Sequence, residues 1–114
     1  MEFEVVSYQD ENGNSPVDEF LDDLSKTQPI LYRQTQAGIG RLRYRGNHGF
    51  PLTKAIGDGL YELRVGGQDI ARVLWFFVAG AKIVFVEAFV KKTSGIPDVN
   101  RKRALQRRDS YLKR

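Results

Sequence analysis

The sequence predicts an α+β fold, in which two N-terminal helices pack on a curved, mainly antiparallel sheet of four or more strands and a further helix ends the chain. Three apolar runs rich in β-branched and aromatic residues, at residues 60–65, 70–78 and 83–90, are separated by short glycine-containing loops. This pattern is typical of two successive β-hairpins. Two segments with helical spacing precede these runs and one follows them. With 114 residues and no internal repeat, we expect one domain spanning residues 1–114.

The N-terminal part begins with residues 2–8, where apolar and acidic residues alternate as in a half-buried strand. Ser15 and Pro16 are suited to the N-cap and first position of a helix, with acidic residues in its first turn. The apolar side chains that follow are spaced to share one face of this helix, namely Val17, Phe20, Leu21 and Leu24.

A second helix is predicted to start at Pro29 and to end near Arg45. Gly38 and Gly40 lie inside it, and each costs up to about 1 kcal/mol relative to alanine in a helix interior. These glycines indicate either close packing of the helix on the sheet or a break in it.

Residues 46–51 (GNHGFP) form a loop that carries the only histidine, His48. A general base or a ligand is one interpretation, but we expect a solvated loop residue. Residues 52–56 form a short strand that contains Lys54. After the hairpins, residues 93–96 form a turn, and Pro97 starts a helix whose apolar stripe is Ala104, Leu105, Tyr111 and Leu112. This spacing assigns Tyr111 to the core.

The charge is unevenly distributed along the chain. The net charge is +4, but residues 1–25 hold eight acidic residues and no lysine or arginine, whereas residues 91–114 hold nine basic and two acidic residues. Either one end faces a basic partner and the other a polyanion, or both are solvated faces. No apolar run approaches the roughly 20 residues needed to span a bilayer. There is no cysteine, and the acidic N-terminal segment does not resemble a signal peptide. We therefore expect a cytoplasmic protein without a membrane span.

Cations within the apolar runs are the main functional signal, since burying a charge is costly unless an anion meets it. A three-residue loop at 67–69 places Arg64 opposite Arg72, whereas a two-residue loop at 66–67 puts them on opposite faces. A three-residue loop at 79–81 places Arg72 opposite Ala88, on the face shared by Lys92. We expect this convergent register, because it gives both arginines a shared anionic ligand.

Four segments follow one another along the chain: GDGLYELR at 57–64, Ala71-Arg72-Val73 on an aromatic strand, FVKKT at 89–93, and the basic helix that a proline starts. In this order they resemble the phage-derived Gp49-like toxins, which are HigB-type members of the RelE/ParE toxin superfamily. The resemblance implies the same fold and a ribosome-dependent endoribonuclease that cuts mRNA in the ribosomal A site. It also implies inhibition by a helix-turn-helix (HigA-like) antitoxin. The family's recurrent basic positions match Arg64, Arg72 and Lys92, with Lys91 beside them and Lys54 upstream. The histidine and aspartate sites of some HigB proteins are missing.

Cutting RNA without a metal requires a base for the 2′-OH, cations for the crowded phosphate and an acid for the leaving oxygen. Arginine suits phosphate and stays charged, so we assign Arg64 and Arg72 to charge stabilisation. A lysine acts as a base only where burial and neighbouring cations lower its pKa from about 10.4, and we assign Lys92 to this work. The remaining cations are assigned to substrate phosphates: Lys54, Lys91, Arg101, Arg107 and Arg108. Neither a cofactor nor a metal is expected.

Each of these cations also has a structural interpretation. Arg64 can pair with Glu62 or with an acid of the first helix, Arg72 can pair with Glu87, and residues 91–92 can be a solvated strand end. Two other functions remain open for the whole chain. One is a non-enzymatic inhibitor similar to the ParE toxins that bind DNA gyrase. The other is a small basic nucleic-acid-binding module, because phosphate attraction carries no sequence information.

Overall fold

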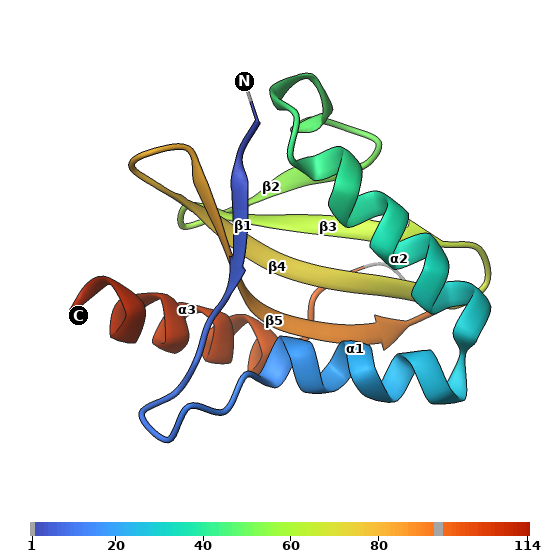
Figure 1. Ribbon diagram of the computed structural model, residues 1–114, viewed down its shortest axis with the longest axis horizontal. Coiled ribbons are helices and arrows are strands. Elements are labelled where there is room, and N and C mark those ends of the chain that lie inside the picture. Colours follow the sequence, from blue (N-terminus) through green and yellow to red (C-terminus); the bar gives the residue numbers. More distant parts are fainter. Residues whose placement is uncertain (1, 93–94) are drawn as a thin grey trace.

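The computed structural model describes residues 2–92 and 95–114, in which a five-stranded sheet lies between helices (Figure 1). The strand order is β1-β5-β4-β3-β2. The strand bounds are β1 (Glu4–Ser7), β2 (Thr53–Gly57), β3 (Leu60–Gly66), β4 (Ile70–Val78) and β5 (Lys82–Lys91). Strands β2 to β5 pair antiparallel with their chain neighbours, and β1 pairs parallel with β5. The predicted α+β class, hairpins and loops at 67–69 and 79–81 are confirmed; of the predicted turn at 93–96, residues 93–94 lie outside the described residues.

The helices cover both faces of the sheet. Helices α1 (Pro16–Thr27) and α2 (Pro29–Leu42) pack on one face, and α3 (Asp98–Leu112) packs on the other. Helix α1 begins where the sequence predicts, but Ser15 makes no side-chain capping bond, contrary to the expected N-cap interaction. Helix α2 ends at Leu42 rather than near Arg45, and a short 3-10 turn follows it. None of the described helices is long and apolar enough to cross a membrane.

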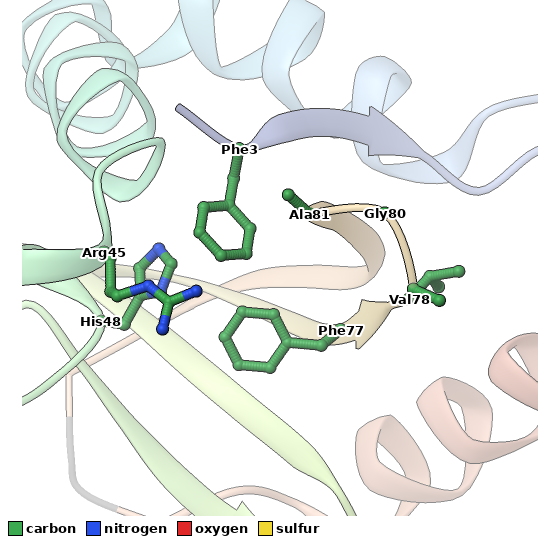
Figure 2. Close-up of a pocket in the computed structure, with 8 residues that line it drawn as sticks. Phe3, Arg45, His48, Phe77, Val78, Gly80 and Ala81 are labelled. Atoms are coloured by element: carbon green, nitrogen blue, oxygen red, sulfur yellow. The ribbon is translucent and has the colours of Figure 1, made fainter. Parts of the chain in front are cut away.

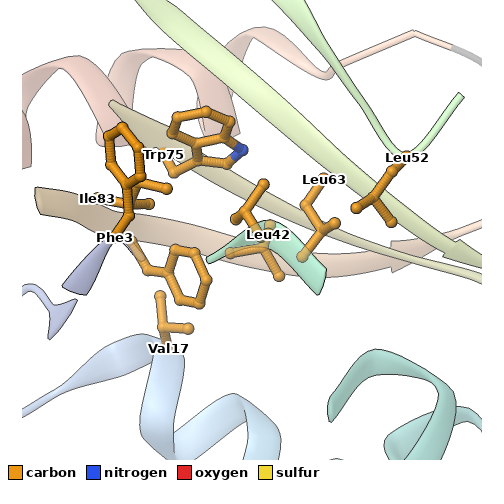
Figure 3. Close-up of a cluster of buried hydrophobic side chains, with 9 residues drawn as sticks. Phe3, Val17, Leu42, Leu52, Leu63, Trp75 and Ile83 are labelled. Carbon is orange, nitrogen blue, oxygen red and sulfur yellow. The ribbon is translucent and has the colours of Figure 1, made fainter. Parts of the chain in front are cut away.

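The main core lies between the sheet and helices α1 and α2 (Figure 3). Its buried members come from both helices, from strands β3, β4 and β5, and from the residues just before β1 and β2: Phe3, Val17, Leu42, Leu52, Leu63, Val73, Trp75, Ile83 and Phe85. Burying a large apolar side chain contributes about 1.5–3 kcal/mol. The one polar group of Trp75 is satisfied, because its Nε1–H donates to Thr53 Oγ1 at 3.1 Å and that hydroxyl donates to the Glu62 carbonyl at 2.8 Å.

The two glycines of α2 differ in their surroundings. A Cβ at Gly38 would lie 2.8 Å from Cγ2 of Val65, which is closer than real contacts allow, whereas a Cβ at Gly40 would meet nothing within 4 Å. Gly38 therefore lets α2 approach β3 closely, and the helix does not break. Close packing was one of the two interpretations of these glycines, and it is the correct one for Gly38.

A bulge in β5 changes which side chains share a face. Leu74 pairs with Glu87 and Trp75 pairs with Phe85, so Val86 is an extra residue in β5. Before the bulge Phe85 faces the main core, while Val86 and Glu87 both face α3. The alternation of side chains is thus reversed after Val86 relative to a regular strand.

A second core joins the sheet to α3. It contains Ala104 and, partly buried, Leu105 and Tyr111, whose ring meets Phe76 edge-on with centroids 5.9 Å apart. The assignment of Tyr111 to the core is confirmed. Leu112, however, is exposed and does not belong to the apolar stripe.

Candidate nucleic-acid interface

The two strand arginines lie side by side on the α3 face of the sheet. Arg64 pairs with Arg72 in the β3–β4 register, and Lys54 of β2 pairs with Glu62 of β3. Because residues in register point to the same face and alternate residues of a strand share a face, all four side chains lie on this face. The predicted convergence of Arg64 and Arg72 is confirmed.

A single buried carboxylate stands between the two guanidinium groups. Oε2 of Glu62 lies 3.0 Å from Nη1 of Arg72, and its Oε1 lies 3.6 Å from Nε of Arg64. The Arg72 side chain is 1% exposed and also donates to the Gly95 carbonyl at 3.4 Å. The alternative in which Arg64 pairs with Glu62 is therefore correct, whereas the alternative in which Arg72 pairs with Glu87 is wrong, since Arg72 pairs with Glu62. Because its side chain is buried, Arg72 does not contact a ligand from solution directly.

Arg64 is held less firmly than Arg72. Its Nε is 3.6 Å from Oε1 of Glu62, beyond hydrogen-bond distance, and both buried atoms have no hydrogen-bond partner among the described residues. The Arg64 side chain remains 28% exposed. Buried polar atoms without a hydrogen-bond partner in the protein are unusual, and a ligand from solution is one way to complete their bonding. Arg64 is thus the strand arginine that can meet an anion from solution.

The bulge in β5 decides which of the two lysines at the end of that strand, Lys91 or Lys92, lies on the arginine face. Arg72 pairs with Phe89 rather than with Ala88, and Lys91 pairs with Ile70, so that Lys91 shares the Arg72 face. The Nζ of Lys91 donates to the Gly95 carbonyl at 3.3 Å, the same oxygen that Arg72 contacts. Lys92 is 78% exposed, and its Nζ lies 3.8 Å from Asp69. The prediction that Lys92 shares the arginine face is wrong, and the burial that its acid–base role required is not found there.

The arginines that the sequence assigned to substrate phosphates from the last helix instead hold α3 to the sheet. Arg101 pairs with Asp58 at 3.0 Å, and Arg108 donates to the Asp58 carbonyl. Arg107 donates to the Val86 carbonyl at 2.8 Å and to Glu87 at 3.1 Å. Two more groups of α3, Asn100 and Arg103, also bond Glu87. Their contacts explain how a helix with a narrow apolar stripe docks on the sheet.

Positive charge therefore exceeds negative charge on the part of this face that α3 leaves open. Among residues 2–92 and 95–114, the four cations Lys54, Arg64, Arg72 and Lys91 lie there with the carboxylate of Glu62. Lys54 is exposed and Lys91 half-buried. Sequence reasoning treated Glu62 only as a possible partner of Arg64 and missed its central place, although its position between Tyr61 and Leu63 in an apolar strand was a signal of burial.

A separate pocket lies at the other end of β4, against the main core (Figure 2). Its volume is about 720 Å³, and Phe3, Arg45, His48 and Phe77 surround it. His48 is not the solvated residue that the sequence predicted. Its ring packs against Phe3 and Phe77 with centroids 4.7 and 5.4 Å away, and Nε2 lies 2.6 Å from the Leu42 carbonyl. These contacts give His48 a structural role. Within residues 2–92 and 95–114, no three His, Asp or Glu residues cluster as metal ligands would.

The family of the chain follows from a comparison with protein-family sequence models. The model of the phage-derived Gp49-like proteins matches residues 19–109, which include both strand arginines, Glu62 and Lys91. The chain belongs to this family. The Gp49-like family is part of the RelE/HigB toxin-like group, as the resemblance in the sequence implied. A search of the curated proteins gave no match.

Proposed function

We propose that this Gp49-like protein is the toxin of a type II toxin–antitoxin system, and that it cuts mRNA on the ribosome in the cytoplasm without a metal. The observation that carries the proposal is the excess of cations around Glu62 on the open part of the α3 face, in a family of the RelE/HigB group. A polyanion is the ligand that such a face attracts.

The reaction that fits these groups is attack of a ribose 2′-oxygen on the adjacent phosphorus. The new O–P bond forms as the bond to the 5′-oxygen breaks, which leaves a 2′,3′-cyclic phosphate and a free 5′-hydroxyl. The 2′-OH loses its proton to a base, and the leaving oxygen gains one from an acid. Arg64 stabilises the charge of the transition state, because it is the arginine that is exposed and incompletely bonded.

Arg72 and Glu62 act as positioning residues in this scheme. The buried 3.0 Å pair fixes the carboxylate, and the carboxylate holds Arg64 over the sheet. Lys54 and Lys91 lie on the same face of the sheet as Arg64. Lys91, as a neutral amine, takes the proton of the 2′-OH and then returns it as an ammonium to the leaving 5′-oxygen, and Lys54 binds substrate phosphate. Lys91 takes the role that the sequence gave to Lys92.

Adjacent lysines on different faces provide a matched test. We would induce the protein in cells and map mRNA ends by primer extension, with Lys91→Ala, Lys92→Ala and Arg64→Ala variants. Loss of an acid–base or charge-stabilising group typically lowers the rate by about a hundredfold or more. We expect this loss for Lys91→Ala and Arg64→Ala, and cuts at the wild-type level for Lys92→Ala, which removes the same charge one residue away.

Three results would contradict the proposal. Equal loss in the Lys91 and Lys92 variants would mean that only net charge matters. Growth arrest with double-strand DNA breaks and no mRNA cuts would support a gyrase inhibitor. Absence of both effects would leave a basic nucleic-acid-binding module.

We further propose a helix-turn-helix (HigA-like) antitoxin as the partner. Two surfaces of opposite charge are available to it. One is the cationic face around Arg64, and the other is the outer side of α1, where four acidic side chains are exposed: Asp18, Glu19, Asp22 and Asp23. Co-purification with the product of a neighbouring gene tests the partnership, and a harmless protein that purifies alone would contradict it.

A further inference from the structure

The loop before β2 carries a very exposed aromatic ring. Phe50 is 80% exposed, more than any other large hydrophobic side chain in the described part of the chain. The loop around it is nevertheless bonded on both sides. The Asn47 amide donates to the Arg41 carbonyl at 2.9 Å, the Thr53 N–H donates to the Gly49 carbonyl at 3.2 Å, and the Arg64 N–H donates to Leu52 at 3.0 Å. The fold thus presents this ring to solvent from a braced loop.

Two pockets lie against Phe50, and Arg64 lines both. One has a volume of about 420 Å³ and is also lined by Arg41 and Asn47. The other has a volume of about 220 Å³ and is also lined by Val65 and Ile70. The incompletely bonded arginine of the proposed active site is therefore also a wall of the space beside the exposed ring.

An exposed aromatic ring beside hollows that arginines line matches one ligand class in particular. Single-stranded nucleic acids are held by aromatic rings that stack on bases and by cations that follow the phosphates. Arginine adds bidentate phosphate contacts, which an apolar peptide would not use. Both arginines lie within one short stretch of surface together with the ring.

We infer that Phe50, Arg41 and Arg64 form a nucleotide subsite for single-stranded RNA. Phe50 stacks on the base next to the scissile bond, Arg64 holds the scissile phosphate, and Arg41 holds the phosphate beyond it. This inference rests on the proposed function, because it places the subsite relative to the phosphate that Arg64 would bind. Stacking on Phe50 accepts any base, so this subsite sets the position of the strand and not its sequence.

The test measures binding apart from cleavage. A fluorescein-labelled, 2′-O-methylated single-stranded oligonucleotide, which lacks the attacking hydroxyl, is titrated with purified full-length protein and followed by anisotropy. We expect Phe50→Ala to weaken binding about tenfold, since loss of base stacking typically costs that much or more. Phe50→Trp should restore binding. Tyr44→Ala is the matched control, because Tyr44 is an exposed aromatic that lines neither of these pockets.

A change on the RNA side makes the test specific for stacking. An abasic site moved along the oligonucleotide should weaken wild-type binding at one position and leave Phe50→Ala binding unchanged there, as a double-mutant cycle requires of two groups in contact. Since Phe50 is so exposed, Phe50→Ala should melt at the wild-type temperature.

Several outcomes would overturn the inference. They are no binding by the wild-type protein, equal weakening by Phe50→Ala and Tyr44→Ala, or additive effects of the abasic site and Phe50→Ala. These outcomes are independent of mRNA cleavage in cells. If mRNA is cut in cells but binding does not depend on Phe50, only the proposed subsite is refuted. If binding depends on Phe50 but no mRNA is cut, only the proposed nuclease activity is refuted.

Discussion

Glu62→Gln should be far more destabilising than Glu87→Gln, although both substitutions remove one buried carboxylate. At Glu62 the substitution leaves the Arg72 guanidinium, 1% exposed, without its 3.0 Å counter-charge. At Glu87 the partner side chains are Arg103 and Arg107, which are 45% and 19% exposed. The difference between the two variants in free energy of unfolding therefore reports whether the remaining cation can be solvated.

The expected magnitudes follow from this difference. Removing one partner of a fully buried ion pair costs about 3–5 kcal/mol, because an uncompensated charge remains in the interior. Where the cations can turn to solvent, the loss is close to that of charged hydrogen bonds, about 1–3 kcal/mol. Against a typical total stability of about 5–15 kcal/mol, Glu62→Gln is close to unfolding the domain.

Urea denaturation provides the assay. The only tryptophan, Trp75, is completely buried and reports the transition by fluorescence. We expect a lower midpoint for Glu62→Gln than for Glu87→Gln at an unchanged m-value. The double variant Glu62→Leu/Arg72→Met should regain most of the loss, since apolar replacement of a buried pair is often neutral or stabilising. Equal costs for the two glutamines, or a double variant no more stable than Glu62→Gln, would refute the reasoning.

Further predictions concern packing, a buried hydrogen bond and pH. Gly40→Ala should stabilise the protein by about 0.5–1 kcal/mol, since its Cβ meets nothing. Gly38→Ala should destabilise it by about 1–3 kcal/mol, since its Cβ would clash with β3. Melting temperatures of the two variants that shift in the same direction relative to the wild type would contradict this. Thr53→Val removes the acceptor of the Trp75 N–H and should cost about 1–3 kcal/mol in urea denaturation, whereas Thr53→Ser should cost less. The backbone N–H of Asn14, with that of Asn12, lowers the pKa of Asp10 below 3.8, so its contribution to stability is present above that pH and is lost as pH falls through the lower folded-state pKa. An NMR titration of the Asp10 carboxyl with a midpoint at or above 3.8 would contradict that assignment.

Much of the fold was predictable because its signals are local. Alternation with a period of two, glycine-containing loops and helical spacing of apolar residues each arise within about ten neighbouring residues. The three-residue loops at 67–69 and 79–81 were chosen because they let both arginines share a ligand, and the first of them places Arg64 opposite Arg72. The role of Gly38 was predictable only as one of two alternatives, because the residue that it approaches lies on a different element.

The candidate site was less predictable, because one extra residue in a strand moves every side chain that follows it to the opposite face of the sheet. The extra residue at Val86 put Lys91, and not Lys92, on the arginine face. Nothing in the regular apolar pattern of 83–90 marks a bulge, and the bulge places Glu87 against Arg103 and Arg107 of α3. The partners of Arg101 and Arg108 at Asp58 are equally distant in sequence.

The sequence by itself determined the order of elements, the hairpins and a cation-rich face, since these depend on residue type and spacing along the chain. Only the tertiary structure decided which cations are available to a ligand. Arginines of helix α3 form ion pairs with Glu87 and Asp58, and Arg72 is buried in its ion pair with Glu62. Arg64 remains partly exposed beside Phe50. The physical reason is that a charge near the core must be paired, and its partner is chosen by which elements pack together in three dimensions.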